Sequence, residues 1–364
     1  MKITYPHMGN LYIAVRALLV GLGHDPVLPP PTSRKTVLLG VRHAPEFACF
    51  PLKLNLGNFL EAREIGADTV LMAGGIGPCR FGYYAEVERE ILTGLGVSMK
   101  MVVLEPPSGD WATFKARARS LIGGCSWWQV LKAIRFAWYK ARAVDLLESE
   151  LLYLRPRLWE PLQLEAIYRE ALSRVDAAEN RKDLDLAVSA FLKDTRGLPG
   201  KSGDLLRVGL VGEIFTVLEP YANYDLERHL GLLGVEVTRS IFLSEWINEH
   251  LFGGLLRVGC LSHLDKAASP YLNAFVGGHG RETVGATVHF ARQGYDGVVQ
   301  VAPFTCMPEI VAHSVLPAVA RDHEIPTLSF YLDEQSGVAG IVTRLEAFVD
   351  LLEARRRKRL KEGV

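Results

Sequence analysis

The chain has 364 residues, 49% of them hydrophobic and 23% charged, which is typical of a folded protein with more than one core. Lysine plus arginine and aspartate plus glutamate both total 41, so no net charge attracts nucleic acid. No run reaches the roughly 18–20 apolar residues of a membrane span. Five scattered cysteines do not form a disulfide framework, so we expect a cytoplasmic protein. From the balanced charge and the lack of a long apolar run, we expect it to bind neither nucleic acid nor membrane.

The first part of the chain alternates short apolar runs with segments of helical period. We predict strands at residues 3–5, 26–28, 68–72 and 101–104, and helices at 11–22, 52–65 and 83–95. Strands that alternate with helices indicate a parallel sheet covered on both faces. Residues 1–108 are therefore predicted to form an N-terminal α/β lobe.

Residues 109–200 carry long segments of helical period and almost no strand signal, for example at 127–152 and 162–175. We interpret them as a helical insert. Its aromatic residues are expected to form packing faces: Trp127, Trp128, Phe136 and Trp138. A stretch rich in glycine and proline at 197–203 indicates a linker.

Residues 201–364 repeat the α/β pattern. Strands are predicted at 206–211, 235–237, 297–301 and 327–330, and helices at 226–233, 282–293 and 309–322. A long final helix at 338–359 ends in a basic run that we interpret as a solvated helix end. The sequence thus predicts an α/β fold of two Rossmann- or flavodoxin-like lobes with parallel sheets and a helical insert between them.

Three cysteines, Cys49, Cys79 and Cys306, stand next to prolines in expected loops, where the fixed φ of proline makes a stiff turn. Cys79 and Cys306 follow strands, at the sheet edge where α/β proteins bind ligands. Cys49 precedes a helix, whose N-terminus favours a thiolate. Three such thiolates suit an iron–sulfur cluster. Without a CxxC pair, a zinc site and three buried thiols remain open alternatives. Cys125 and Cys260 are expected to be structural thiols.

Two further residues on the same predicted rim are candidates for proton transfer. Glu213 follows the strand at 206–211, and His279 lies in a glycine-rich turn at 277–280. His279 could instead cap a helix, and Glu213 could instead orient a partner. The glycine-rich turns at 74–77 and 277–280 match no nucleotide-binding pattern, which favours tight turns without a phosphate.

Several short motifs resemble the 2-hydroxyacyl-CoA dehydratase superfamily. The resemblance is closest to proteins related to CoA-substrate-specific enzyme activases and to the D component of 2-hydroxyglutaryl-CoA dehydratase. It lies in CFPLKL at 49–54 with Gly57 and Asn58, GPCRFG at 77–82, GEI at 212–214, GHG at 278–280, FTCMPE at 304–309, DEQSG at 333–337 and TRLEAF at 343–348. It covers both lobes.

The resemblance implies a cluster held by Cys49, Cys79 and Cys306, most often 4Fe–4S, between the two α/β domains. It further implies a low-potential electron delivered by a separate ATP-dependent activator protein with an actin-like fold. In true dehydratases that electron turns a CoA thioester into a ketyl radical, from which water can leave. We therefore expect an oxygen-sensitive iron–sulfur protein of anaerobic metabolism that acts on a small substrate, as a dimer or beside a second dehydratase-like subunit.

The chain also departs from these relatives. It has no DxGxTxxK signature of an actin-like ATPase, so we do not expect it to hydrolyse ATP, and it has no second cysteine set for a double cubane. Two alternatives to an enzyme stay open. One is a non-catalytic electron relay or scaffold subunit, and the other is a metal-free α/β binding protein with structural cysteines.

Overall fold

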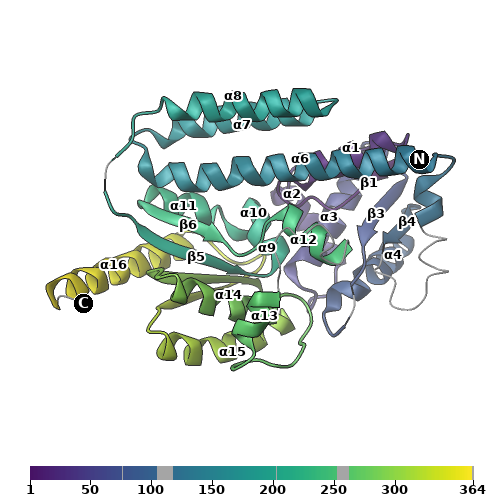
Figure 1. Ribbon diagram of the computed structural model, residues 1–364. Helices are drawn as coiled ribbons and strands as arrows, with labels where there is room; N and C mark the ends of the chain where they lie inside the picture. Colours follow the sequence, from purple (N-terminus) through teal and green to yellow (C-terminus); the bar gives the residue numbers. More distant parts are fainter. Residues whose placement is uncertain (76, 105–117, 202, 252–261, 363–364) are drawn as a thin grey trace.

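Two separate parallel sheets of four strands each organise the computed structural model, which describes residues 1–75, 77–104, 118–201, 203–251 and 262–362 (Figure 1). The first sheet has the order β2-β1-β3-β4, and its strands are β1 (Lys2–Thr4), β2 (Asp25–Pro26), β3 (Thr69–Ala73) and β4 (Lys100–Leu104). The second has the order β6-β5-β7-β8, with β5 (Leu206–Gly212), β6 (Val235–Arg239), β7 (Gly297–Pro303) and β8 (Thr327–Leu332). Each predicted strand has a counterpart, so the predicted α/β class with two parallel lobes is confirmed.

Helices cover the faces of both sheets. The first lobe contains α1 (Leu11–Gly21), α2 (Arg34–His43), α3 (Phe50–Glu64), the short 3₁₀ helix η1 (Arg80–Tyr83) and α4 (Tyr84–Gly94). The second contains α9 (Ile214–Leu218), α10 (Pro220–Asn223), α11 (Leu226–Leu232), α12 (Leu243–Leu251), α13 (Ser262–Ala268), α14 (Gly280–Arg292), α15 (Met307–Asp322) and α16 (Val338–Glu362). None of the helices in the described ranges combines the length and apolar character that crossing a bilayer requires.

Two glycines let α2 and α3 pack at backbone distance. A Cβ added to Gly40 would lie 1.7 Å from the Lys53 carbonyl oxygen, and one added to Gly57 would lie 2.0 Å from the Thr36 carbonyl oxygen. Any larger residue would push the helices apart. Together with packing on the first sheet and on Phe215 of the second lobe, this contact buries α3 almost completely and fixes the helix that begins after Cys49.

The helices that lie between the two sheets in the sequence contact both lobes. They are α6 (Trp127–Leu154), the 3₁₀ helix η2 (Arg155–Arg157), α7 (Pro161–Ala177) and α8 (Arg181–Arg196). Val130 and Ala133 of α6 join the core of the first lobe, whereas Ala141 and Leu152 join that of the second. Figure 1 shows α6 running along both lobes, with α7 and α8 on its far side. Because one helix enters both cores, it braces the two sheets against each other.

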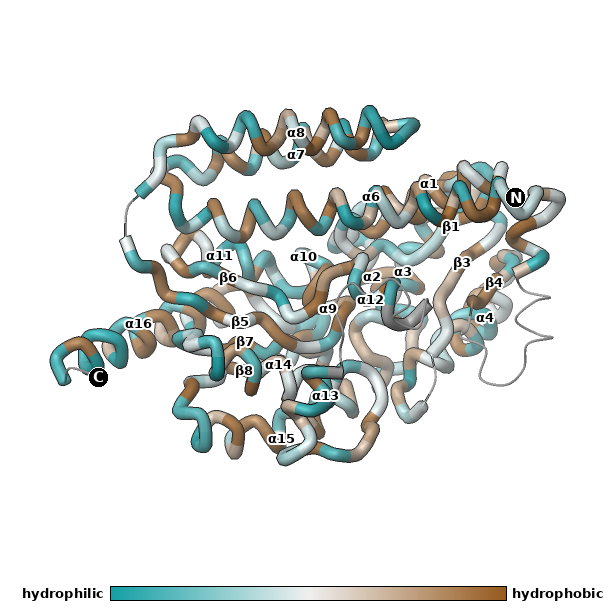
Figure 2. The backbone as a smooth tube through the Cα atoms, viewed as in Figure 1, coloured by the Kyte–Doolittle hydropathy of each residue, from teal (hydrophilic) through white to brown (hydrophobic). Residues whose placement is uncertain are grey.

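The distribution of apolar residues agrees with the sequence-based expectations except at two tryptophans of α6. Apolar residues run along β3 and β5, while α16 becomes polar toward its end (Figure 2). Phe136 and Trp138 are half-buried, as expected for a packing face. Trp127 and Trp128 are instead 74% and 79% exposed, so the prediction that they pack is wrong. They lie at the start of α6, where Val130 and not the two tryptophans faces the core of the first lobe.

Candidate functional site

The carboxyl ends of the central strands of the two sheets supply the site. In the first sheet the chain leaves β1 toward β2 and returns on the other side as β3, which makes a switch point between β1 and β3. The second sheet has the same switch point between β5 and β7. Cys79 follows β3 and Cys306 follows β7, so these two cysteines come from equivalent positions in the two lobes.

Each of the three cysteines is the residue from which a helix begins. Cys49 is the N-cap of α3, Cys79 that of η1 and Cys306 that of α15, all with extended backbone. Pro51 and Pro308 occupy the first turns of α3 and α15, where a proline loses no helical hydrogen bond. The prolines after Cys49 and Cys306 therefore act as helix starts, whereas Pro78 precedes Cys79 and lies outside η1.

A single guanidinium group joins the three cysteine loops. Arg80, next to Cys79, donates from Nη1 to the Phe47 carbonyl oxygen at 2.7 Å, two residues before Cys49. Its Nη2 donates to the Thr305 carbonyl oxygen at 2.5 Å and to Thr305 Oγ1 at 2.8 Å, directly before Cys306. The loops of both lobes therefore meet at one place.

The glycine-rich turn at 277–280 closes the same place from the second lobe. A Cβ added to Gly277 would lie 2.8 Å from the Cys79 main-chain nitrogen, and one added to Gly278 would lie 3.7 Å from the Cys79 Sγ. The same atom on Gly278 would stand 3.1 Å from the Pro308 side chain. Both glycines also have positive φ, 79° and 49°. This turn is glycine-rich because two backbones approach closely around the thiols.

Burial and neighbouring acidic groups raise the pKa of two of the three thiols. Burial is the main cause that raises the pKa of Cys79, and Glu213 and Cys49 add to the effect. Burial also raises the pKa of Cys306 far above its usual range, with further contributions from Glu309, Glu213 and Cys49. The main-chain amides of Phe81 and Glu309, at the starts of η1 and α15, lower the pKa of Cys79 and Cys306 respectively, but burial outweighs them. A bound cation would reverse this balance, because metal ligation removes the proton from a thiol.

The two residues predicted to transfer protons occupy cap positions. Glu213 is the N-cap of α9: its carboxylate accepts from the main-chain amides of Phe215 at 3.0 Å and Thr216 at 2.9 Å, and from the Thr216 hydroxyl at 2.9 Å. Burial raises the pKa of Glu213, and its charge acts on Cys79 and Cys306, so it does lie near the thiols. His279 is the N-cap of α14 and is buried, but its side chain makes no capping hydrogen bond.

The structure adds a buried acid that the sequence did not single out. Glu309 lies in the first turn of α15 and is fully buried. It accepts from the Thr283 hydroxyl at 3.0 Å and from Gln300 Nε2 at 2.9 Å, and burial raises its pKa to about 8. Its place three residues after Cys306 is the only local signal that could have found it.

A second unpredicted feature links two of the motifs. Lys53, four residues after Cys49, forms an ion pair of 2.5 Å with Glu334 in the loop between β8 and α16. The CFPLKL motif of the first lobe and the DEQSG motif of the second are therefore partners across the lobes.

The donor set of the site, three cysteine thiols, is one that could hold an iron–sulfur cluster. No group of three or more His, Cys, Asp or Glu side chains within the described ranges could hold one metal ion. In a cluster each thiolate binds a different iron, so its ligands need not converge on one point. Cys125 stands apart from the three cysteine loops, with its thiol directed at the Leu22 carbonyl oxygen at 3.2 Å. Cys260 lies outside the described residues.

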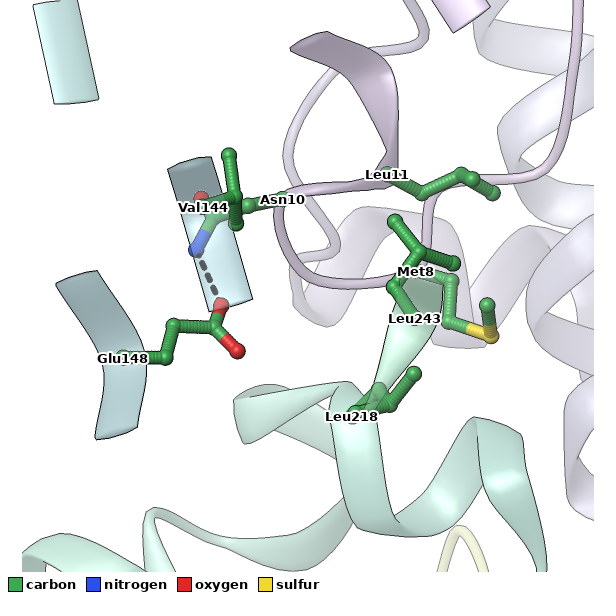
Figure 3. A pocket seen from close by; sticks show the side chains of 7 residues that line it. All are labelled: Met8, Asn10, Leu11, Val144, Glu148, Leu218 and Leu243. Atoms are coloured by element: carbon green, nitrogen blue, oxygen red, sulfur yellow. Dashed lines mark hydrogen bonds between the residues drawn. The ribbon is translucent and has the colours of Figure 1, made fainter. Parts of the chain in front are cut away.

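A shallow pocket lies where the two lobes meet α6 (Figure 3). It is lined by Met8, Asn10, Leu11, Val144, Glu148, Leu218 and Leu243. Asn10 donates to Glu148 Oε1 at 2.7 Å, and the other oxygen of Glu148 pairs with Arg239. Its cavity volume is about 10 Å³, no more than a single water molecule needs. No cysteine lines it.

Comparison with known proteins does not assign the chain to a family. No protein-family model and no curated protein matches it. The function must therefore be argued from the site itself.

Proposed function

We propose that this chain binds an iron–sulfur cluster, 4Fe–4S in the simplest form, through Cys49, Cys79 and Cys306. The observation that carries the proposal is that three thiols, each at the start of a helix, come from both lobes to a site tied together by Arg80. Bound there, the cluster would supply one-electron transfer at low potential. The burial of Cys49 and Cys306 and the close glycine turn would limit the access of water to it.

The proposed activity is the reduction or dehydration of a small substrate, with a CoA thioester as the expected class. Electrons would come from a separate ATP-dependent activator with an actin-like fold. Exposed aromatic side chains flank each cysteine and offer that partner an apolar contact: Phe47 is 78% exposed, Tyr83 66% and Phe304 57%. A reduced, cytoplasmic compartment suits such thiols, and a dimer or a dehydratase-like second subunit would complete the complex.

A second candidate function is an electron relay without catalysis. Cys49 and Cys306 are only 7% and 6% exposed. The pocket of Figure 3 is too small for a CoA ester and is lined by no cysteine. Addition of CoA thioesters to the reduced protein separates the two functions. An enzyme would change its electron paramagnetic resonance spectrum on binding, and a relay would not.

The cluster itself is tested by anaerobic purification or reconstitution with iron and sulfide. Iron, acid-labile sulfide and the visible spectrum are measured for the native chain and for Cys49→Ala, Cys79→Ala and Cys306→Ala. We expect each of these variants to lose most of the iron, whereas Cys125→Ala, as a matched control, keeps it. Native protein that stays folded and binds no iron would rule out the proposal.

A further inference from the structure

We propose that Arg80 is the positioning residue that holds the three cysteine loops of both lobes in one arrangement. The inference rests on the proposed function for its purpose, but the positioning itself is a property of the cluster-free chain. Arg80 lies on the first lobe, beside Cys79, and contacts the loop before Cys49 in its own lobe and the loop before Cys306 in the other. Thr305 Oγ1 adds one longer contact between the same two loops, 3.4 Å from the Phe47 carbonyl oxygen.

The geometry of these contacts requires arginine. Nη1 serves the Phe47 carbonyl oxygen, while Nη2 serves both the carbonyl oxygen and Oγ1 of Thr305. A planar guanidinium with several donors fixed in a fork can meet acceptors on two loops at once. A lysine ammonium is a single point on a flexible stem and cannot hold both loops in the same orientation.

The backbone conformation of Thr305 is a second reason to assign the positioning role to Arg80. Its φ is 67°, in the left-handed region that a β-branched residue rarely adopts. Such a conformation persists only where the surroundings impose it. Arg80 donates to two atoms of this residue, and Thr305 Oγ1 also lies 3.4 Å from the Phe47 carbonyl oxygen. The three residues form one closed set of contacts directly before Cys306.

Replacement of Arg80 should open the loops without unfolding the protein. Its side chain is exposed, so its loss leaves no cavity in either core. Cys49 and Cys306, by contrast, are buried and depend on the loops for their protection. The accessibility of each thiol therefore reports directly on the position of its loop.

The first experiment uses the reduced, cluster-free protein and measures the rate of iodoacetamide labelling at each cysteine by mass spectrometry. In Arg80→Met we expect Cys49 and Cys306 to react about fivefold faster, a ratio that corresponds to about 1 kcal/mol. Cys125 should react at its native rate. Arg80→Lys should behave like Arg80→Met, because the charge alone does not hold the loops.

The control is Arg89→Met, which removes an exposed arginine of α4 whose partner is Glu86 on the same helix. It should label like the native protein. Thr305→Val removes one of the three acceptors and leaves Arg80 in place, so it should raise the labelling of Cys306 by a smaller factor. It also keeps the test available if Arg80→Met does not fold. Unchanged rates in Arg80→Met, an equal rise at Cys125, or native rates in Arg80→Lys would overturn the inference.

The second experiment compares the loss of iron to a chelator in cluster-loaded native protein and in Arg80→Met. Faster loss in the variant supports positioning, and equal rates contradict it. If the native chain binds no iron, the proposed function fails, while the labelling rates still decide the role of Arg80.

Discussion

The ion pair between Lys53 and Glu334 should contribute measurably to stability because both partners are largely buried. Their side chains are 6% and 17% exposed, and Lys53 Nζ lies 2.5 Å from Glu334 Oε1. The other oxygen of Glu334 has no hydrogen-bond partner within the described ranges. The positive charge of Lys53 therefore offsets the cost of burying the Glu334 carboxylate at the boundary between the lobes.

Lys53→Met keeps the length of the side chain and removes its charge. Breaking a buried pair in this way costs about 3–5 kcal/mol, because the remaining charge is left without a partner. Glu334 keeps some contact with water, so we expect the free energy of unfolding to fall by about 3 kcal/mol, at the lower end of that range. The double variant Lys53→Met with Glu334→Leu should recover most of the loss, since an apolar pair can replace a buried ion pair at little net cost.

Urea unfolding followed by circular dichroism measures both single variants and the double variant as a thermodynamic cycle. The matched control is Lys35→Met. Lys35 is 56% exposed and pairs with the exposed Glu64 and, at 3.8 Å, with Glu61, so water screens its pairs and its loss should cost clearly less than the loss of Lys53. The reasoning is refuted if Lys53→Met costs no more than Lys35→Met, or if the two single effects simply add.

Three further predictions concern other buried groups. Burial raises the pKa of Asp145 from 3.8 to about 7. The folded protein therefore keeps a proton that the unfolded chain releases, and stability should fall by up to about 4 kcal/mol as the pH rises through this interval. Asp145→Asn should remove that slope and be the more stable form above pH 7; parallel pH profiles would contradict this. Gly40→Ala should lower the melting temperature sharply because its Cβ would lie 1.7 Å from the Lys53 carbonyl oxygen, whereas Gly94→Ala meets nothing within 4 Å and should be neutral or stabilising. Glu213→Ala should lower the unfolding free energy by about 1 kcal/mol because it removes the side-chain acceptor at the start of α9, and an unchanged value would contradict the cap.

The strands could be predicted from the sequence because each is a short apolar run bounded by glycine or proline, and such a run has one stable place inside a covered sheet. The helix α2 was missed although Ser33 and Thr36 form a capping box at its start. The exposure of Trp127 and Trp128 was also missed, since helical period alone does not reveal whether a partner covers a face.

Some residues of the candidate site could likewise be found from the sequence, and others could not. The cysteines could be found because proline beside cysteine is a local signal, and their place after strands follows from the alternation of elements. Lys53 and Glu334 carry no such signal, because a buried ion pair is recognised only when both partners are in place. The same is true of Glu309, whose burial depends on Thr283 and Gln300.

The sequence by itself determined the elements: two parallel sheets, a helical segment between them in the chain, and three cysteines beside prolines, two after strands and one before a helix. These follow from period, proline and glycine, which act over a few residues. Only the tertiary structure decided that the loops of Cys49, Cys79 and Cys306 share one place, that Arg80 joins them, and that α6 braces both lobes. Contacts between residues more than two hundred positions apart depend on how two finished lobes dock, and no local pattern encodes that geometry.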